Sequence, residues 1–430
     1  YKITDKMVFR AGYGIFYLQT AGSGATNNDG YSLATPWVST VGGDGIHPAA
    51  PLSNPFPQGL LSPVGNSQGL LTDLGLGVNA YQQQHPSGYS QNFSGDFQIQ
   101  VGRGSVVQFG YSGSLGRKLL WGFGQNANQL PDTLLSLGPA LDQQVANPFY
   151  GIITNGTLSG KTVPAQQLLR PFPQFASVNL STDTPGASSS FNALVVQFTH
   201  QFSSGFSILS TYQFSKALDN ASETQAWEIG DTYRDYNNHK LDWSISGHDV
   251  PQSFVTNLVW ELPVGKGKRF GASMPAALNA VVGGWEVSSI IRFASGLPLQ
   301  FFAANTLGVY GYGVDRPNIA GTVTSPASSP SQWFNTAAFA QPGTYQIGNA
   351  ARWLGNLRFE PTHNSDMALI KNFQVNERIR VQFRAEAFNV SNTPQYGRAD
   401  TTITDGGFGT VTGTTNVGPR ALQFALKIFY

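Results

Sequence analysis

The chain ends on a strand-like run in which every second residue is apolar, ALQFALKIFY at positions 421–430. Successive side chains of an extended strand point to opposite faces of a sheet. One face of this run therefore carries Leu422, Phe424, Leu426, Ile428 and Tyr430. Soluble domains usually end in a few poorly ordered residues, so an apolar face that reaches the last residue predicts that another surface covers it.

The same period of two recurs along the chain. Clear examples are YSQNFSGDFQIQV at 89–101, WEVSSIIRF at 285–293 and IRVQFRAEAF at 379–388. Strict alternation of this kind is typical of strands with one apolar and one wet face. We predict about ten such strands, near 7–18, 88–101, 105–113, 191–202, 206–217, 250–262, 284–297, 364–374, 378–390 and 419–430.

The connections between these strands alternate between short and long. Tight turns are expected at 102–104, 203–205 and 376–378, and a medium one at 263–284. The long connections fall near 19–87, 114–190, 218–249, 298–363 and 391–418. Outer-membrane barrels have short periplasmic turns and long extracellular loops. The pattern therefore predicts an all-β fold, an antiparallel up-and-down transmembrane β-barrel that is partial at about ten strands, with both chain ends on the short-turn rim.

Composition agrees with this fold class. Charged residues make up 11% of the chain, against roughly 25% in typical soluble proteins, while Gly contributes 49 residues and aromatics 12%. The net charge of +1 gives no support for nucleic-acid binding, and the lack of cysteine excludes disulfides and thiolate metal sites. No apolar stretch approaches the roughly 18 residues of a transmembrane helix. A β-barrel instead spans with about ten alternating residues per strand.

Charged residues on the polar face of the strands point to a hydrated interior. An Arg or Lys side chain facing lipid at the bilayer midplane costs about 2–4 kcal/mol. We therefore expect the charged side chains of the strands to face a lumen and the apolar set to face acyl chains. The predicted lumen-facing residues are Asp96, Glu286, Arg292, Arg380, Arg384 and Glu386.

No catalytic or cofactor motif is visible. The six histidines show no HExxH or paired metal spacing, and the Ser/His pairing of a barrel hydrolase is not visible. GKGKRFGAS at 265–273 lacks the order of a phosphate-binding loop and is interpreted as a basic periplasmic turn. His239 and His248 flank KLDWSISG, where a metal or siderophore contact is the alternative to a solvated loop. We predict no catalytic residues, no metal site and no cofactor.

The loop SETQAWEIGDTYRDYNNHKLDW at 222–243 is the best candidate for ligand contact. It combines aromatic rings, which stack on sugars, peptides or aromatic chelates, with charges that orient them. The candidate residues are Trp227, Tyr233, Arg234, Tyr236 and Trp243. The alternative is an outer loop that folds over itself.

Nine segments in order resemble one known family. The chain is similar over most of its length to the C-terminal barrel of TonB-dependent outer-membrane receptors, closest to the Oar-like group common in Acidobacteria. The long loops are the weakest part of the likeness. The segments are VFRAGYGIFY (8–17), RPFPQFASVN (170–179), SSFNALVVQFTHQFSSGFSILSTYQFSKALDN (189–220), ELPVGKGKRF (261–270), GGWEVSSIIRFASGLPL (283–299), DRPN (315–318), WFNTAAFAQP (333–342), VQFRAEAFNVSNTPQYG (381–397) and PRALQFALKIFY (419–430).

The resemblance implies a location in the outer membrane of a Gram-negative cell, and a receptor or transporter for TonB-dependent uptake of a scarce external ligand. In this family the last strand is the recognition signal for the barrel-assembly machinery; the matching positions are Leu422, Phe424, Leu426, Ile428 and Tyr430. Implied partners are outer-membrane lipid, that machinery, the TonB complex acting through an N-terminal plug, and an unidentified small ligand, glycan or peptide.

Such receptors resemble plugged barrels of 22 strands, so about ten strands correspond to half of one. We expect residues 1–430 to be the C-terminal part of one barrel domain, with the plug, the TonB box and the signal peptide upstream of Tyr1. Three alternatives stay open. They are a self-contained outer-membrane pore or adhesin without a plug, a secreted carbohydrate-binding β-sandwich, and, least favoured, a barrel hydrolase.

Overall fold

The computed structural model describes residues 1–18, 29–82, 84–121, 124–180, 184–203, 205–221, 233–324, 329–415 and 418–430. Its main feature is a twelve-stranded sheet in which each strand pairs with its neighbours antiparallel. The strands are β1 (Lys2–Thr4), β2 (Met7–Tyr17), β4 (Tyr89–Gln100), β5 (Ser105–Leu120), β10 (Pro185–Ser203), β11 (Phe206–Asp219), β12 (Ser244–Ile245), β13 (Gln252–Glu261), β14 (Trp285–Ala294), β19 (Thr362–Gln374), β20 (Arg380–Phe388) and β21 (Ala421–Phe429). All ten predicted strands are confirmed.

Shorter elements lie in the connections. The strands are β3 (Gly77–Ala80), β6 (Gln125–Asn126), β7 (Gln144–Ala146), β8 (Thr162–Pro164), β9 (Ser177–Leu180), β15 (Pro298–Leu299), β16 (Asn318–Ile319), β17 (Phe339–Ala340) and β18 (Leu354–Arg358). The α-helices are α1 (Ala165–Leu168) and α2 (Ala276–Val282), and the 3₁₀ helices are η1 (Val41–Gly43), η2 (Gly69–Leu71), η3 (Asp132–Asp142), η4 (Gly156–Ser159), η5 (His239–Asp242) and η6 (Thr336–Ala338). Within the described residues, no helix is long and apolar enough to cross a membrane.

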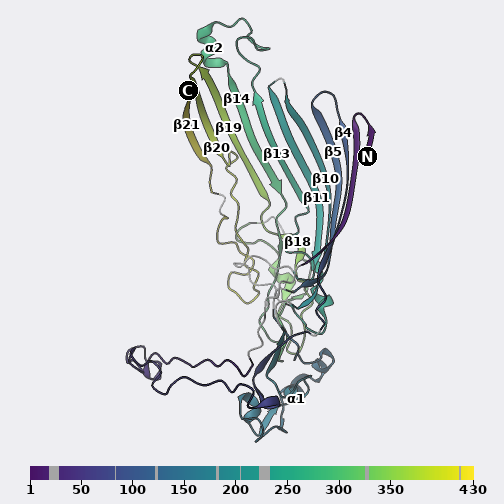
Figure 1. Cartoon of the computed structure of the whole chain (residues 1–430), viewed down its shortest axis with the longest axis vertical. Helices are drawn as coiled ribbons and strands as arrows, with labels where there is room; N and C mark the ends of the chain where they lie inside the picture. The colour runs from purple at the N-terminus through teal and green to yellow at the C-terminus, as the bar shows by residue number, and fades with distance from the viewer. Residues whose placement is uncertain are drawn as a thin grey trace.

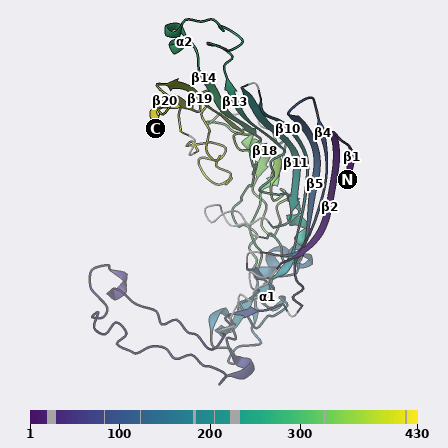
Figure 2. The ribbon, with the colours of Figure 1, turned by 45° about the horizontal axis from the view of Figure 1, so that its top comes forward.

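The connections divide between the two ends of the sheet as predicted. Figure 1 shows the strands side by side, with α2, the short turns and both chain ends near the upper end, and the long connections below. The sheet is curved and open: in the described residues β1 pairs with β2, β21 pairs with β20, and these two edge strands do not meet. In Figure 2 the sheet bends around the C-terminal connections, drawn in olive.

The register separates a polar from an apolar face. Residues that pair directly across a sheet project to the same side, and one such row runs Gln98, Gln108, Gln197, Thr211, Val255, Arg292 and Asn364. The spacing of two along each strand places Asp96, Glu286, Arg292, Arg380, Arg384 and Glu386 all on this face. The opposite face carries the row Tyr212, Phe254, Phe293 and His363.

The apolar face is open at its C-terminal edge. In β21 the side chains of Leu422, Phe424, Leu426 and Ile428 are 61–68% exposed. Apolar surface of this extent is not stable in water, since each square ångström left wet forgoes roughly 25 cal/mol. The face therefore fits an acyl-chain environment.

Buried apolar clusters lie in the long connections and not between the strands. We use the name loop cap for residues 124–180, 233–251, 295–361 and 389–415. The largest cluster of the loop cap centres on Phe301, whose ring stacks on Phe339 at 4.3 Å and meets Phe334 edge-on at 5.0 Å. A second cluster surrounds Leu130 and Leu141. The loop cap therefore has a core of its own at the long-connection end of the sheet.

One long connection lies mostly outside the packed loop cap. Residues 29–72 extend away from the sheet, as the dark purple trace in Figures 1 and 2 shows, and the chain returns to the loop cap at β3, which pairs with β9. Several of its apolar side chains are exposed, including Leu52 at 88% and Leu70 at 97%. This arm contrasts with the packed loop cap.

Candidate ligand site

A pocket of about 700 Å³ lies where the polar face of the sheet meets the loop cap. Its floor is formed by polar-face side chains of four neighbouring strands, Gln213, Ser253, Arg292 and Thr362. Its rim is formed by residues of the loop cap, among them Phe359, Glu360, Tyr396 and Arg398. Because loop residues on the inner side of the bend close over this face, the polar face is the concave one. The volume is within the usual range of small-molecule sites, about 300–1,000 Å³.

Two arginines in this pocket have no carboxylate partner among the described residues. Arg292 is exposed and makes no side-chain hydrogen bond or ion pair with the described residues, while Arg398 lies over the ring of Phe359 at 5.5 Å. Guanidinium groups present several N–H donors in a fixed plane that matches carboxylate and phosphate groups. The arrangement can therefore bind an anion.

One carboxylate shares the pocket. Glu360 is partly buried, and this burial raises the pKa of its carboxyl above the ordinary value. Tyr396 packs edge-on against Trp333, with ring centroids 6.2 Å apart. An aromatic wall, two cations and a single acid favour a ligand with a planar apolar body and negative charge.

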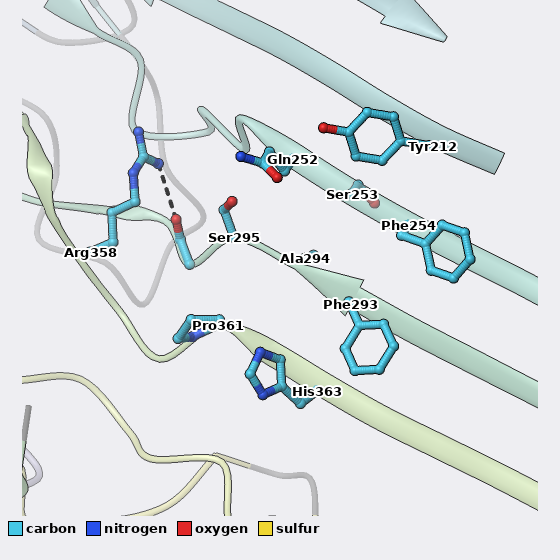
Figure 3. A pocket seen from close by; sticks show the side chains of 11 residues that line it. Tyr212, Gln252, Ser253, Phe254, Phe293, Ala294, Ser295, Arg358, Pro361 and His363 are labelled. Atoms are coloured by element: carbon cyan, nitrogen blue, oxygen red, sulfur yellow. Dashed lines mark hydrogen bonds between the residues drawn. The ribbon is translucent and has the colours of Figure 1, made fainter. Parts of the chain in front are cut away.

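A smaller pocket of about 340 Å³ lies at the same end of the sheet (Figure 3). Tyr212, Phe254, Phe293 and His363 line it, and the register places them on the apolar face. Phe254 and Phe293 stack at 6.4 Å, and Phe293 meets His363 edge-on at 5.6 Å. Aromatic side chains form such girdles at both interfaces of a membrane barrel. The smaller pocket is thus assigned to the lipid-facing side.

The predicted contact residues Tyr233 and Arg234 are buried in the loop cap. The amide of Asn126 donates to the Tyr233 hydroxyl at 2.8 Å, and this hydroxyl donates to the carbonyl of Gly311 at 3.1 Å. Arg234 donates to the carbonyl oxygens of Gly348, at 2.5 Å, and Ala350. Burial lowers the pKa of Arg234 to about 10. These two side chains join three connections that are far apart in sequence.

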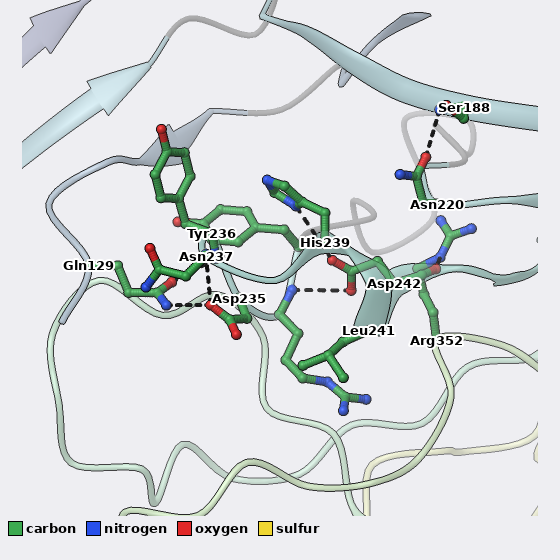
Figure 4. A network of polar contacts seen from close by, with 12 residues as sticks. Gln129, Ser188, Asn220, Asp235, Tyr236, Asn237, His239, Leu241, Asp242 and Arg352 are labelled. Carbon is green, nitrogen blue, oxygen red and sulfur yellow. Dashed lines mark hydrogen bonds and ion pairs between the residues drawn. The ribbon is translucent and has the colours of Figure 1, made fainter. Parts of the chain in front are cut away.

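Ion pairs extend this network through the loop cap (Figure 4). Arg316 donates to Asp242 at 2.6 Å, and both side chains are almost completely buried. Arg352 pairs with Asp219, and Arg358 pairs with Asp249 at 2.6 Å. His239 stacks on Trp121 at 4.3 Å, with its Nδ1 3.8 Å from Asp242 Oδ2. Within the described ranges, no three His, Asp or Glu side chains converge on a possible metal site.

Asp235 is the exception in this network, because no cation of the described chain pairs with it. The carboxylate is fully buried and accepts a hydrogen bond from Gln129 Nε2 at 2.5 Å and one from the amide of Asn237 at 2.9 Å. Burial raises the pKa of Asp235 to about 6, and the neighbouring carboxyl of Asp132 adds to the shift. The ionised form of the Asp235 carboxyl is therefore disfavoured in the loop cap.

The other predicted site residues are distributed more widely. Trp243 is 43% exposed and Tyr236 is partly buried, so ligand contact by these two stays a prediction, as does contact by Tyr233 and Arg234 in another arrangement of the loops. Trp227 lies outside the described residues.

Of the predicted lumen-facing residues, Arg292 lines the larger pocket. Arg384 instead pairs with Glu386 at 2.6 Å, and Arg380 lies over the ring of Phe429 at 4.4 Å. Sequence reasoning missed Tyr396, Arg398 and Glu360. The run NTPQYGR at 392–398 carried the only signal, an aromatic and a basic residue after a turn-forming stretch.

The match to a family model decides the class of this protein. The model described as "Outer membrane beta barrel domain" matches residues 1–423. The chain belongs to this family. An outer membrane β-barrel domain places the protein in the outer membrane, with the apolar face toward lipid and the polar face toward the interior. No curated protein matches the chain.

Solved structures similar to this barrel domain include three outer-membrane proteins. The outer membrane transporter YddB from Escherichia coli has 8% identity and a TM-score of 0.38, over 83% of this chain and 34% of that one. The ferric-catecholate import receptor Fiu from E. coli K12 has 8% identity and a TM-score of 0.38, over 100% and 34%. The pyoverdine receptor FpvA from Pseudomonas aeruginosa, bound to pyoverdine, has 10% identity and a TM-score of 0.35, over 80% and 30%. The chain thus spans about a third of the length of these structures.

Proposed function

We propose that this barrel domain is part of a TonB-dependent outer-membrane receptor that captures a scarce external ligand and imports it. The observation that carries the proposal is the pocket at the long-connection end of the sheet, in which Arg292 and Arg398 have no carboxylate partner among the described residues. The ordered resemblance of nine segments to Oar-like receptors supports the same conclusion. We assign the domain no catalytic step.

Capture would begin at the long-connection end, which faces outward when the short turns are periplasmic. The cations attract an anionic ligand, and the rings of Phe359 and Tyr396 contact its apolar body. Neither arginine is in an ion pair with a described residue, so none of these contacts must break on binding. Binding therefore needs little rearrangement of the pocket floor.

Release and translocation need energy, which the outer membrane does not supply. We propose that the TonB complex acts on a plug domain outside this chain, and that the barrel contributes the wall, the lumen and the loops. The C-terminal positions Leu422, Phe424, Leu426, Ile428 and Tyr430 would be read by the barrel-assembly machinery; they are exposed along an edge strand.

Uptake genetics tests this function. Strains lacking the receptor gene, lacking TonB, or carrying Arg292→Gln with Arg398→Gln would be grown with single iron chelates, vitamins, glycans or peptides as the limiting nutrient. We expect one nutrient on which all three strains fail together. Growth that depends on the receptor gene but not on TonB would contradict energised import.

The runner-up function is a plug-free pore or adhesin, and the exposed arm at 29–72 is the observation that favours it. An apolar surface that is left exposed is typical of an interaction site. Leu33, Trp37 and Leu70 of the arm are each more than half exposed. If the arm is an adhesin, its deletion abolishes surface attachment and leaves nutrient uptake intact.

A further inference from the structure

The connection between β13 and β14 is longer and carries more basic residues than the tight turns at the same end of the sheet. Residues 263–284 contain Lys266, Lys268 and Arg269 and no acidic residue. They also form α2, a helix of seven residues. The connection lies at the short-turn end of the sheet, where the turns of outer-membrane barrels are periplasmic (Figure 1).

Apolar side chains of this connection are exposed. Leu278 is 50% exposed, Val281 67% and Phe270 56%. None of the α2 residues is buried. A seven-residue helix gains too little from its own hydrogen bonds to be stable alone in water, so α2 depends on what it contacts.

Two side chains of the apolar face hold the end of α2. Trp285 Nε1 donates to the carbonyl of Val281 at 2.9 Å. Lys371 Nζ donates to the carbonyl oxygens of Val281 at 2.8 Å and of Gly283 at 2.6 Å, and lies 4.9 Å from the centroid of the Trp285 ring. Trp285 and Lys371 are direct partners in the register, on the same face as Val287 and Leu369. The helix is therefore fixed beside the lipid-facing surface.

The basic residues are positioned against this helix. The amide of Lys266 donates to Asn279 Oδ1 at 2.7 Å, which ties the turn to α2. Lys268 pairs with Glu261 at 3.0 Å. Lys266 and Arg269 have no acidic partner among the described residues, and Arg269 lies over the ring of Phe270 at 5.5 Å. Two uncompensated cations thus adjoin an apolar helix.

We propose that residues 263–284 bind the periplasmic leaflet of the outer membrane, with Phe270, Leu278 and Val281 among the acyl chains and Lys266 and Arg269 on anionic phospholipid headgroups. Two features on the structure identify lipid as the occupant. The helix continues the lipid-facing surface of the barrel, and residues 263–284 carry three basic side chains and no acidic one. Amphipathic elements with these two features lie in the membrane interface.

The depth of α2 in the membrane can be measured directly, because the chain has no cysteine. Val281→Cys, labelled with an environment-sensitive fluorophore and reconstituted in nanodiscs, should be quenched by brominated acyl chains. Leu70→Cys, on the arm at the opposite end, is the matched control and should not be quenched. An unquenched, water-like emission at position 281 would overturn the proposed insertion.

The headgroup preference is a second, independent readout. With Val281→Cys labelled, quenching by brominated phosphatidylglycerol is compared with quenching by brominated phosphatidylcholine in mixed bilayers. One base near an anionic surface is worth roughly fivefold in binding, so K266Q/R269Q should lower the phosphatidylglycerol preference by roughly 25-fold.

The control K161Q/K240Q removes two bases from the loop cap and should leave this preference unchanged. Equal quenching by the two lipids in the unmodified chain would overturn the assignment of an anionic headgroup. An unchanged preference in K266Q/R269Q would do the same.

Discussion

The buried arginines of the loop cap and the exposed arginines that line the pocket have the same side-chain chemistry and opposite environments. Arg316 and Arg352 are buried, and each pairs with a carboxylate, Asp242 and Asp219 respectively. Arg292 and Arg398 are exposed, and no described carboxylate pairs with them. A cation taken out of water without a partner is strongly destabilising, whereas an exposed one keeps its hydration. The paired arginines therefore hold the loop cap together, and the unpaired ones are available to a ligand.

The largest effect should come from a buried pair. Arg316→Ala leaves the fully buried carboxylate of Asp242 without its cation, which costs about 3–5 kcal/mol. We expect hydrogen exchange in the loop cap to accelerate while the strands of the sheet stay protected. Arg103→Ala, in the tight turn after β4, is the control and should change neither region. Equal protection of the loop cap in Arg316→Ala would contradict its structural role.

Replacing Asp235 should stabilise the loop cap, whereas replacing Arg316 destabilises it. The reason is that burial raises the pKa of the Asp235 carboxyl to about 6. Between pH 4 and 6 the unfolded state is ionised while the folded state holds a proton, so this group makes stability fall as the pH rises. At pH 7 the cost is at most about 3 kcal/mol, at 1.36 kcal/mol per pKa unit. Asp235→Asn should therefore stabilise the loop cap at pH 7 and weaken its pH dependence, as read by thermal unfolding.

The matched control for this prediction is Asp405→Asn, because Asp405 is exposed. That variant should leave the unfolding temperature unchanged at both ends of the pH range. A loop cap that is less stable at pH 7 after Asp235→Asn would mean that the ionised carboxylate contributes favourably.

The pocket arginines should affect binding and not stability. Arg292→Gln or Arg398→Gln removes a charge-assisted hydrogen bond worth about 1.5–3 kcal/mol, so affinity for an aromatic anion should fall at least tenfold. Pyrenetetrasulfonate, followed by fluorescence anisotropy, is a suitable probe. Hydrogen exchange in the loop cap should be unaltered by either variant. Faster hydrogen exchange together with weaker binding would mean that these arginines stabilise the loop cap, as Arg316 and Arg352 do.

The smallest effect should come from Glu360, the carboxylate among the pocket residues. Glu360→Gln removes a like charge from the anion site, and binding of the same probe should tighten a few-fold, by roughly 0.2–1 kcal/mol. Because burial raises the pKa of Glu360, the gain should be larger at pH 8 than at pH 5. A gain of the same size at both pH values would contradict the raised pKa of this carboxyl.

The strands were predictable because two solvents impose the alternation. Lipid on one side and a hydrated interior on the other select a period of two, and the predicted strand at 364–374 is observed as Thr362–Gln374. The predicted end of a strand is wrong where the alternation stops. β5 continues past residue 113 to Leu120, paired with the start of β10, although SLGRKLL at 114–120 does not alternate strictly. Backbone pairing with β10 sustains this extension, together with the hydrogen bond that Arg117 donates to the carbonyl of Ser189.

The loop cap and the pocket were only partly predictable. Arg292 was expected in the lumen because it lies on the polar face of an alternating strand. The pair of Arg352 and Asp219 joins residues 133 positions apart, and no local pattern signals such a contact. Arg398 lies in an irregular connection, and no local pattern signals that its side chain reaches the pocket. The sequence of 222–243 predicted a ligand site from its aromatic and charged residues, and those same properties serve Tyr233 and Arg234 in packing.

The most direct test of an outward-facing, electropositive pocket is the reaction of a single cysteine with membrane-impermeant maleimides in intact cells. Arg398→Cys should be labelled from outside, faster by an anionic reagent than by a neutral one, and Arg292→Gln should remove this preference. Failure to label position 398 in intact cells, or equal rates with the two reagents, would contradict a ligand site at the extracellular mouth.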